Sequence, residues 1–235
     1  MPSKNFVLED GLAVTIYKRR TNRNLRLSIA PSGQIRVSIP AWAPYKAGLD
    51  FAKSRQDWIL SQQKPVVVLG HGQAIGKAHR LSLKPVSGTT KATSRLRETS
   101  VEVRHPTHLE PGSAEVQKVA REASVRALRK QAEQLLPQRL ETLAKQNGLT
   151  YRSVTVKRLK GRWGSCDQQT NIVLNLYLMQ LPWDLIDYVL LHELAHTQVL
   201  RHGPDFWKLM GKLTPSAKDL RSRTQQYQPV LNGSE

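Results

Sequence analysis

Cysteine is almost absent from this sequence of 235 residues, which contains only Cys166. A single cysteine excludes an intrachain disulfide, so we expect a reducing compartment. Long apolar runs are also missing, because nowhere do about 18 consecutive apolar residues occur, as a membrane-spanning helix requires. The N-terminus shows no signal-peptide pattern. We therefore expect a cytoplasmic protein with no membrane span.

Acidic residues are scarce relative to basic ones, at 18 Asp and Glu against 36 Lys and Arg, which gives a formal net charge of +18. Such a positive field attracts polyanions, including nucleotides and nucleic acids. The expected strands that carry Arg26 and Arg36 hold no aromatic pair for stacking bases. Because charge alone identifies no site, a non-specific nucleic-acid interaction and a merely solvated basic surface both stay open.

The motif that dominates the chain is His192-Glu193-Leu194-Ala195-His196, followed six residues later by His202. Two histidines four residues apart on a helix share one face, so both can bind a single metal ion. Glu193 lies about 100° round the helix, where its carboxylate can activate a metal-bound water as general base. This arrangement is typical of zinc-dependent hydrolases. In the alternative, His192 and His196 are hydrogen-bonded core residues and Glu193 is their counter-ion.

A third ligand is needed, because catalytic zinc sites combine three protein ligands with one open position. His202 has the spacing of the third metzincin histidine, but Val199 stands where metzincins have glycine, so the metzincin turn is not expected. His202 precedes Gly203-Pro204, a break before a new helix that can turn the imidazole toward the metal. Asp205 is the rival third ligand.

The patterning changes near Pro111-Gly112-Ser113. Before it, alternating residues at 25–29 and 35–39 around Pro31-Ser32-Gly33 predict a hairpin, and a helix is expected over 45–62. After it, we expect a helix over 114–146, two strands and the buried helix of the metal motif. The sequence thus predicts an α+β protein: an antiparallel β-rich region with a helix at residues 1–110, and a zincin-like catalytic domain with a central His-Glu-x-x-His helix at residues 111–235.

Several motifs carry a family resemblance: Arg162-Trp163-Gly164-Ser165-Cys166, Ile186-Asp187-Tyr188-Val189, the metal motif, and His202-Gly203-Pro204-Asp205-Phe206-Trp207. Together they resemble the YgjP-like zinc metallopeptidases, which are relatives of the SprT-like and weak-suppressor-like metalloproteases. The resemblance implies zinc on His192, His196 and His202, with Glu193 as base. It also implies a mixed β/α zincin core in the C-terminal half.

The Arg-Trp-Gly-Ser-Cys loop lies between two expected strands that precede the metal helix. Zincins pair the substrate backbone with an edge strand beside that helix. Arg162 could therefore hold a substrate carbonyl, carboxylate or phosphate, and Trp163 could wall the cleft. The alternative is a tight turn with Trp163 as core filler. We expect Cys166 to be a buried structural thiol.

These observations favour a zinc metallopeptidase that acts on polypeptides. Two alternatives stay open, because function is decided by the site and not by the fold. One is a metal-dependent phosphohydrolase acting on nucleoside triphosphates, since a metal ion also polarises phosphoryl oxygens. The other is a basic nucleic-acid-binding protein with a structural zinc, whose site would be closed by a fourth protein ligand.

Overall fold

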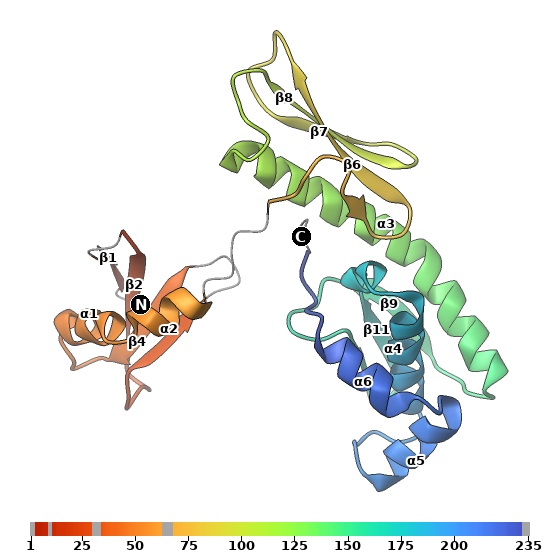
Figure 1. Cartoon of the computed structure of the whole chain (residues 1–235). Helices are drawn as coiled ribbons and strands as arrows, with labels where there is room; N and C mark the ends of the chain where they lie inside the picture. The colour runs from red at the N-terminus through yellow and green to blue at the C-terminus, as the bar shows by residue number, and fades with distance from the viewer. Residues whose placement is uncertain (1–2, 9–10, 30–33, 63–67, 232–235) are drawn as a thin grey trace. The chain divides into compact units, whose positions relative to one another are not determined.

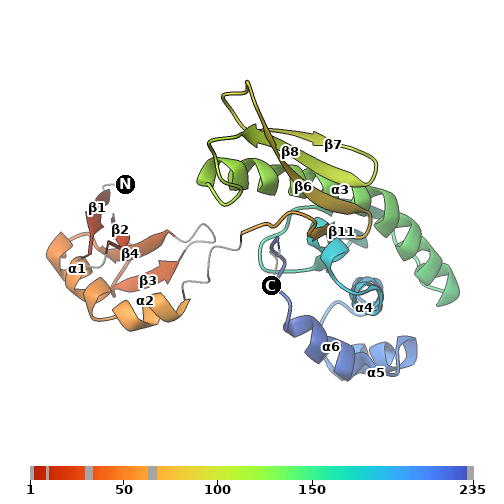
Figure 2. The same cartoon turned by 45° about the horizontal axis from the view of Figure 1, so that its top comes forward.

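The computed structural model describes residues 3–8, 11–29, 34–62 and 68–231 (Figures 1 and 2). The chain is mixed α+β, as predicted, and forms two compact units, Met1–Val67 and Val68–Glu235. Each unit has its own cluster of buried apolar side chains. Within the described ranges, every helix is too short or too polar to serve as a membrane span.

The first unit contains a four-stranded sheet in the order β1-β2-β4-β3. Its strands are β1 (Ser3–Val7), β2 (Ala13–Arg19), β3 (Arg26–Ile29) and β4 (Ile35–Pro40). The predicted hairpin is confirmed, since β3 and β4 pair antiparallel; its turn, Pro31-Ser32-Gly33, lies outside the described residues. The expectation of a purely antiparallel region was wrong, because β2 pairs with β4 in parallel. Alternation predicts the buried face of a strand but not its neighbour.

The single helix expected over residues 45–62 is in fact two, α1 (Tyr45–Lys53) and α2 (Gln56–Gln62). Ser54 stands between them, and its hydroxyl donates a hydrogen bond to the carbonyl of Phe51 at 3.0 Å. Such local side-chain bonds compete with the helical hydrogen-bond pattern. Both helices bury apolar side chains against the sheet, and the shared core includes Ile16, Val37, Ile39, Ala52 and Ile59.

In the second unit, a four-stranded sheet packs on one long helix, α3 (Ala114–Gln146). The strands run in the order β5-β6-β8-β7, and they are β5 (Ala74–Ile75), β6 (His79–Val86), β7 (Thr93–Leu96) and β8 (Ser100–Pro106). Buried glutamines of α3 fix this sheet: Gln131 accepts from the amide of Lys77 at 2.6 Å, and Gln117 accepts from that of Leu69 at 2.8 Å. The compact units therefore divide at Val67–Val68, earlier than the boundary expected at residue 110.

The C-terminal half of α3 borders the layer that carries the metal motif (Figure 1). A small sheet, in the order β10-β11-β9, consists of β9 (Ser153–Lys157), β10 (Gly164–Cys166) and β11 (Asn171–Asn175). After it come the 3-10 helix η1 (Leu176–Gln180), α4 (Trp183–Ala195), α5 (Pro204–Leu213) and α6 (Ala217–Gln225). Arg139 of α3 binds both carboxylate oxygens of Asp187, at 2.7 and 2.5 Å, and so ties α3 to α4.

Candidate metal centre

Helix α4 places the metal motif at its C-terminal end. Pro182 is the N-cap residue of the helix and has no amide hydrogen of its own. The helix buries apolar residues on most of its surface, including Leu185, Ile186, Leu190 and Leu194. His192 lies in the last turn and His196 is the C-terminal cap. The chain then turns back, and Pro204 begins α5 at its first position. This reversal brings His202 back to the end of α4.

The three imidazoles converge. The Nε2 atoms of His192 and His196 are 3.2 Å apart, those of His196 and His202 are 3.1 Å apart, and those of His202 and His192 are 2.9 Å apart. In a tetrahedral zinc site with Zn–N of about 2.0–2.1 Å, ligand nitrogens stand about 3.3 Å from one another. The three histidines therefore fit a single ion and could hold one.

The ring of Phe206 in α5 packs against all three imidazoles. Its side chain is fully buried, and its ring centroid lies 4.9 Å from that of His192, 4.6 Å from that of His196 and 4.8 Å from that of His202. The Nδ1 of His196 is 3.0 Å from the carbonyl of Val199, which fits a tautomer with its proton on Nδ1. That tautomer leaves the Nε2 lone pair free for a metal.

Burial sets the protonation states of the motif. Desolvation, with the nearby His196, His202 and Arg221, lowers the pKa of His192 to about 3, and burial also lowers the pKa of His196. These two imidazoles are therefore neutral at neutral pH, which is the form that binds metal. Glu193 is only 5% exposed, and burial raises its pKa to about 8 against the opposing charge of Arg162. A cation at the histidines would favour the ionised form of Glu193.

Strand β10 passes directly over the carboxylate of Glu193. A Cβ atom added to Gly164 would lie 2.6 Å from Oε1 of Glu193, so only glycine allows this approach. β10 pairs with β11 on one side only and is an edge of its sheet among the described strands. The predicted loop over residues 161–167 thus contains an edge strand, and this strand lies beside α4.

Asn175 holds the loop that carries Arg162 and Trp163. Its side-chain amide is fully buried and donates to the carbonyls of Arg162 at 2.8 Å and Leu159 at 3.1 Å. Its own backbone amide donates to the carbonyl of Trp163 at 2.8 Å. Asn175 lies at the end of β11, just before η1, so the small sheet fixes the loop rigidly beside α4.

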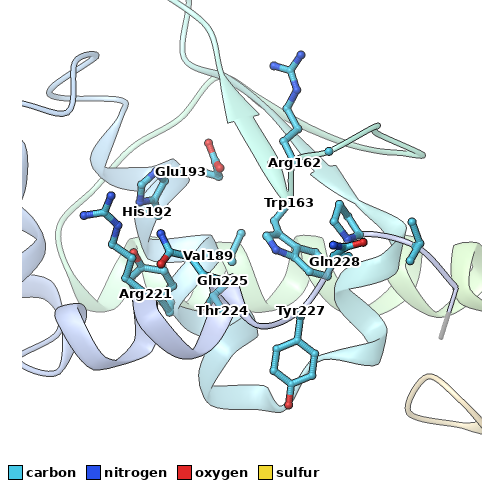
Figure 3. Close-up of a pocket in the computed structure, with 15 residues that line it drawn as sticks. Arg162, Trp163, Val189, His192, Glu193, Arg221, Thr224, Gln225, Tyr227 and Gln228 are labelled. Carbon is cyan, nitrogen blue, oxygen red and sulfur yellow. The ribbon is translucent and has the colours of Figure 1, made fainter. Parts of the chain in front are cut away.

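A pocket of about 560 Å³ opens at this centre and is lined by both predicted substrate residues, Arg162 and Trp163 (Figure 3). His192 and Glu193 line it as well. Trp163 is half-buried: it lines the pocket and also packs against the hydrophobic core. Its environment therefore has features of both predictions, a wall of the cleft and a filler of the core. The opposite wall comes from α6 and the segment after it, through Arg221, Thr224, Gln225, Tyr227, Gln228, Pro229 and Val230.

The rival third ligand, Asp205, and the expected structural thiol, Cys166, both lie outside the histidine cluster. Asp205 is exposed and does not belong to the metal-binding group that the described residues form. Cys166 is half-buried and also stands apart; burial, with Glu193 and Asp167, raises the pKa of its thiol to about 11. A thiol with this pKa is protonated at neutral pH, which fits a structural residue.

Sequence reasoning missed Phe206 as a support for the imidazoles, and it missed Arg221 altogether. Helix α6 was not predicted, since its sequence is largely polar and shows little apolar periodicity. One feature of the sequence could have indicated the role of Phe206. It is the first apolar residue after the proline that begins α5, and a helix that turns back toward the motif buries such a residue.

Two solved structures are similar to part of the chain. The metallopeptidase zymogen of Pyrococcus abyssi abylysin is 24% identical, with a TM-score of 0.36 over 39% of this chain and 93% of that one. The zymogen of Methanocaldococcus jannaschii jannalysin is 18% identical, with a TM-score of 0.35 over 38% of this chain and 93% of that one. No curated protein matches the chain.

A family model described as "YgjP-like, metallopeptidase domain" matches residues 23–227. The match spans most of the chain and includes the metal motif, the Arg-Trp-Gly-Ser-Cys segment and strands β3 and β4 of the N-terminal sheet. The resemblance drawn from the motifs is thereby confirmed. Metallopeptidases are metal-dependent hydrolases of polypeptides, so the family implies a metal cofactor. The chain belongs to the YgjP-like metallopeptidase family.

Proposed function

We propose that the protein is a zinc-dependent peptidase in which His192, His196 and His202 hold the ion and Glu193 is the general base. The observation that carries this proposal is the convergence of three Nε2 atoms within 2.9 to 3.2 Å of one another. A ligand set of imidazoles alone suits zinc. When bound, zinc supplies Lewis acidity, which polarises a carbonyl group and makes water acidic near neutral pH.

Glu193 performs the proton transfers in this proposal. Its side chain is buried, lines the pocket and lies one residue from His192 on α4. Its carboxylate accepts a proton from the attacking water and then donates it to the departing amine. Burial against β10 fixes this carboxylate in one place, which keeps the distance to the reacting atoms short.

The substrate segment is an extended polypeptide that adds to the free edge of β10. Main-chain hydrogen bonds to an edge strand give affinity, and side-chain pockets give specificity. In this pose Trp163 forms a wall of the cleft, while Arg162 contacts a substrate carbonyl. Every residue with an assigned role falls within residues 111–235, and we place the catalytic domain there.

The test is the substitution Glu193→Gln in full-length protein. We expect one zinc ion per chain, as in the wild type, and a fall in peptide cleavage of about 10²–10⁴-fold, the usual contribution of a general base. Glu141→Gln removes the same charge from the exposed face of α3 and should leave cleavage unchanged. Full cleavage by a zinc-loaded Glu193→Gln protein would contradict the assigned role.

A further inference from the structure

We propose that Arg221 binds a carboxylate of the peptide substrate, so that the pocket selects substrates with a negative charge near the cleaved bond. The inference rests on the proposed peptidase function and deepens it. Arg221 lies on α6 and lines the same pocket as His192 and Glu193 (Figure 3). The carboxylate belongs either to the C-terminus of the peptide or to an acidic side chain.

No carboxylate of the described residues forms an ion pair with Arg221. Among the described residues Arg221 forms no ion pair, whereas its neighbour Arg223 pairs with Asp184 at 2.6 Å and with Asp219 at 3.6 Å. The pocket lining contains one carboxylate, that of Glu193, which the proposed mechanism already uses. Because Arg221 is exposed, an anionic group of the substrate can reach its guanidinium and pair with it.

The exposed guanidinium of Arg221 packs on an aromatic ring. Its guanidinium carbon lies 4.7 Å from the ring centroid of Trp207, and Trp207 is stacked on His202 with 6.1 Å between ring centroids and 26° between ring planes. A guanidinium stacked on an aromatic face keeps the in-plane N–H groups available for a carboxylate. Arg221 is thus connected through one side chain to a proposed metal ligand.

Electrostatics argue against a purely structural role. A guanidinium beside a centre that binds a cation opposes that binding by like-charge repulsion. A neutral side chain would cover Trp207 without this cost. A substrate carboxylate between the Arg221 guanidinium and a cation at the histidines would be attracted by both and would offset their mutual repulsion. This attraction explains an arginine at this position.

Binding measured by calorimetry tests the inference without turnover. Three peptides of equal length are compared: one with Glu and an amidated C-terminus, one with Gln and an amidated C-terminus, and one with Gln and a free carboxylate. Each peptide is titrated into Glu193→Gln protein in two forms, zinc-loaded and metal-free. A carboxylate that binds to the zinc ion would improve binding only in the zinc-loaded form. We expect a carboxylate-bearing peptide to bind about tenfold tighter than the neutral one in both forms. The peptide that shows the preference identifies which carboxylate is bound.

Substitutions then assign the preference to Arg221. Arg221→Gln should abolish it, and Arg221→Met, which keeps the aliphatic cover over Trp207, should do the same in a protein with unchanged thermal stability. Lys218→Gln removes the same charge from an exposed position of α6 outside the pocket lining and should keep the preference. Equal binding of all three peptides, or equal losses in the Arg221 and Lys218 variants, would overturn the inference.

The two proposals fail in different ways. A wild-type protein that cleaves neutral and acidic peptides equally well, with no change in Arg221→Gln, contradicts the role of Arg221 and leaves the peptidase intact. A protein that binds carboxylates through Arg221 but cleaves no peptide contradicts the proposed function and supports the binding role.

Discussion

The contact between Gly164 and Glu193 illustrates how single residues set the chemistry of the centre. The backbone of β10 lies so close to the carboxylate that no side chain fits between them. Glu193 is therefore confined by the strand that we propose to bind substrate. In the proposed mechanism, the same piece of backbone would set the positions of both the peptide and the base.

Gly164→Ala should consequently displace Glu193. The added Cβ would stand 2.6 Å from Oε1, and a shift of about 1 Å in a catalytic group costs about 10²-fold in rate. We expect the variant to bind one zinc ion and to lose peptide cleavage to that degree. Gly211→Ala on α5, where nothing lies within 4 Å of the added atom, is the matched control. Equal activity of the two variants would contradict the proposed confinement.

At the scale of elements, the loop between β9 and β10 depends on β11 through Asn175. Asn175→Ala removes three side-chain hydrogen bonds: the carbonyls of Leu159 and Arg162 lose a donor, and the amide of Tyr177 in η1 loses its acceptor. We expect a loss of about 1–3 kcal/mol in unfolding free energy, measured by urea denaturation. We also expect a rise in KM for peptides, because Arg162 and Trp163 lose their fixed positions.

Asn171→Ala serves as the comparison on the same strand. Asn171 is half-buried and binds Asp167 and Ser153, away from the loop carbonyls that Asn175 holds. It should alter stability without raising KM. A rise in KM of the same size in both variants would show that the Asn175 contacts do not position the loop.

The elements that the sequence predicted are those with strong periodicity and clear ends. Helix α3 ends at Asn147-Gly148 as expected, with Gly148 at a φ of +63°, and α5 begins at its proline. β10 has three residues, too few to show alternation, and polar α6 shows little periodicity. The His192–Glu193–His196 motif was evident because its residues lie within about one helical turn of a single helix. Arg221 was not, because only tertiary packing brings α6 to the pocket.

At the scale of the whole molecule, the two compact units have separate cores. A fragment of residues 68–235 contains every residue of the metal centre and should fold with native-like stability. We expect it to bind one zinc ion with the affinity of the full chain, measured by competition with a chelating dye. Loss of zinc binding in a folded fragment would show that residues 1–67 contribute to the centre.

The charge of +18 is a property of the whole chain, and neither the comparisons nor the described residues support a nucleotide or nucleic-acid partner for it. We propose that part of this charge acts in the pocket, whose lining contains Arg162, Arg221 and a single carboxylate, that of Glu193.

Acid should destabilise the folded protein partly through His79. This residue is 6% exposed, and burial lowers its pKa below the unfolded value of 6.5. Below pH 6.5 the unfolded chain therefore binds a proton that the folded chain does not, and stability falls by up to about 1.4 kcal/mol per pH unit until the folded pKa is reached. Above pH 6.5 this contribution is constant.

The variant His79→Gln isolates this effect in metal-free protein. It retains an acceptor for the amide of Gln131 but has no titrating group. The stability difference between wild type and variant at pH 8 gives the packing cost alone. That difference should shrink as the pH is lowered from 7 to 5. A constant difference across this range would contradict the assignment.

The proposed peptidase depends on three imidazoles that hold one zinc ion and leave a coordination position open. X-ray absorption at the zinc edge of untagged protein can count these ligands. We expect one zinc per chain with three imidazole nitrogens at about 2.0–2.1 Å and one ligand that does not come from the protein. A fourth protein ligand, such as the sulfur of Cys166, or fewer than three imidazoles at the ion, would contradict it.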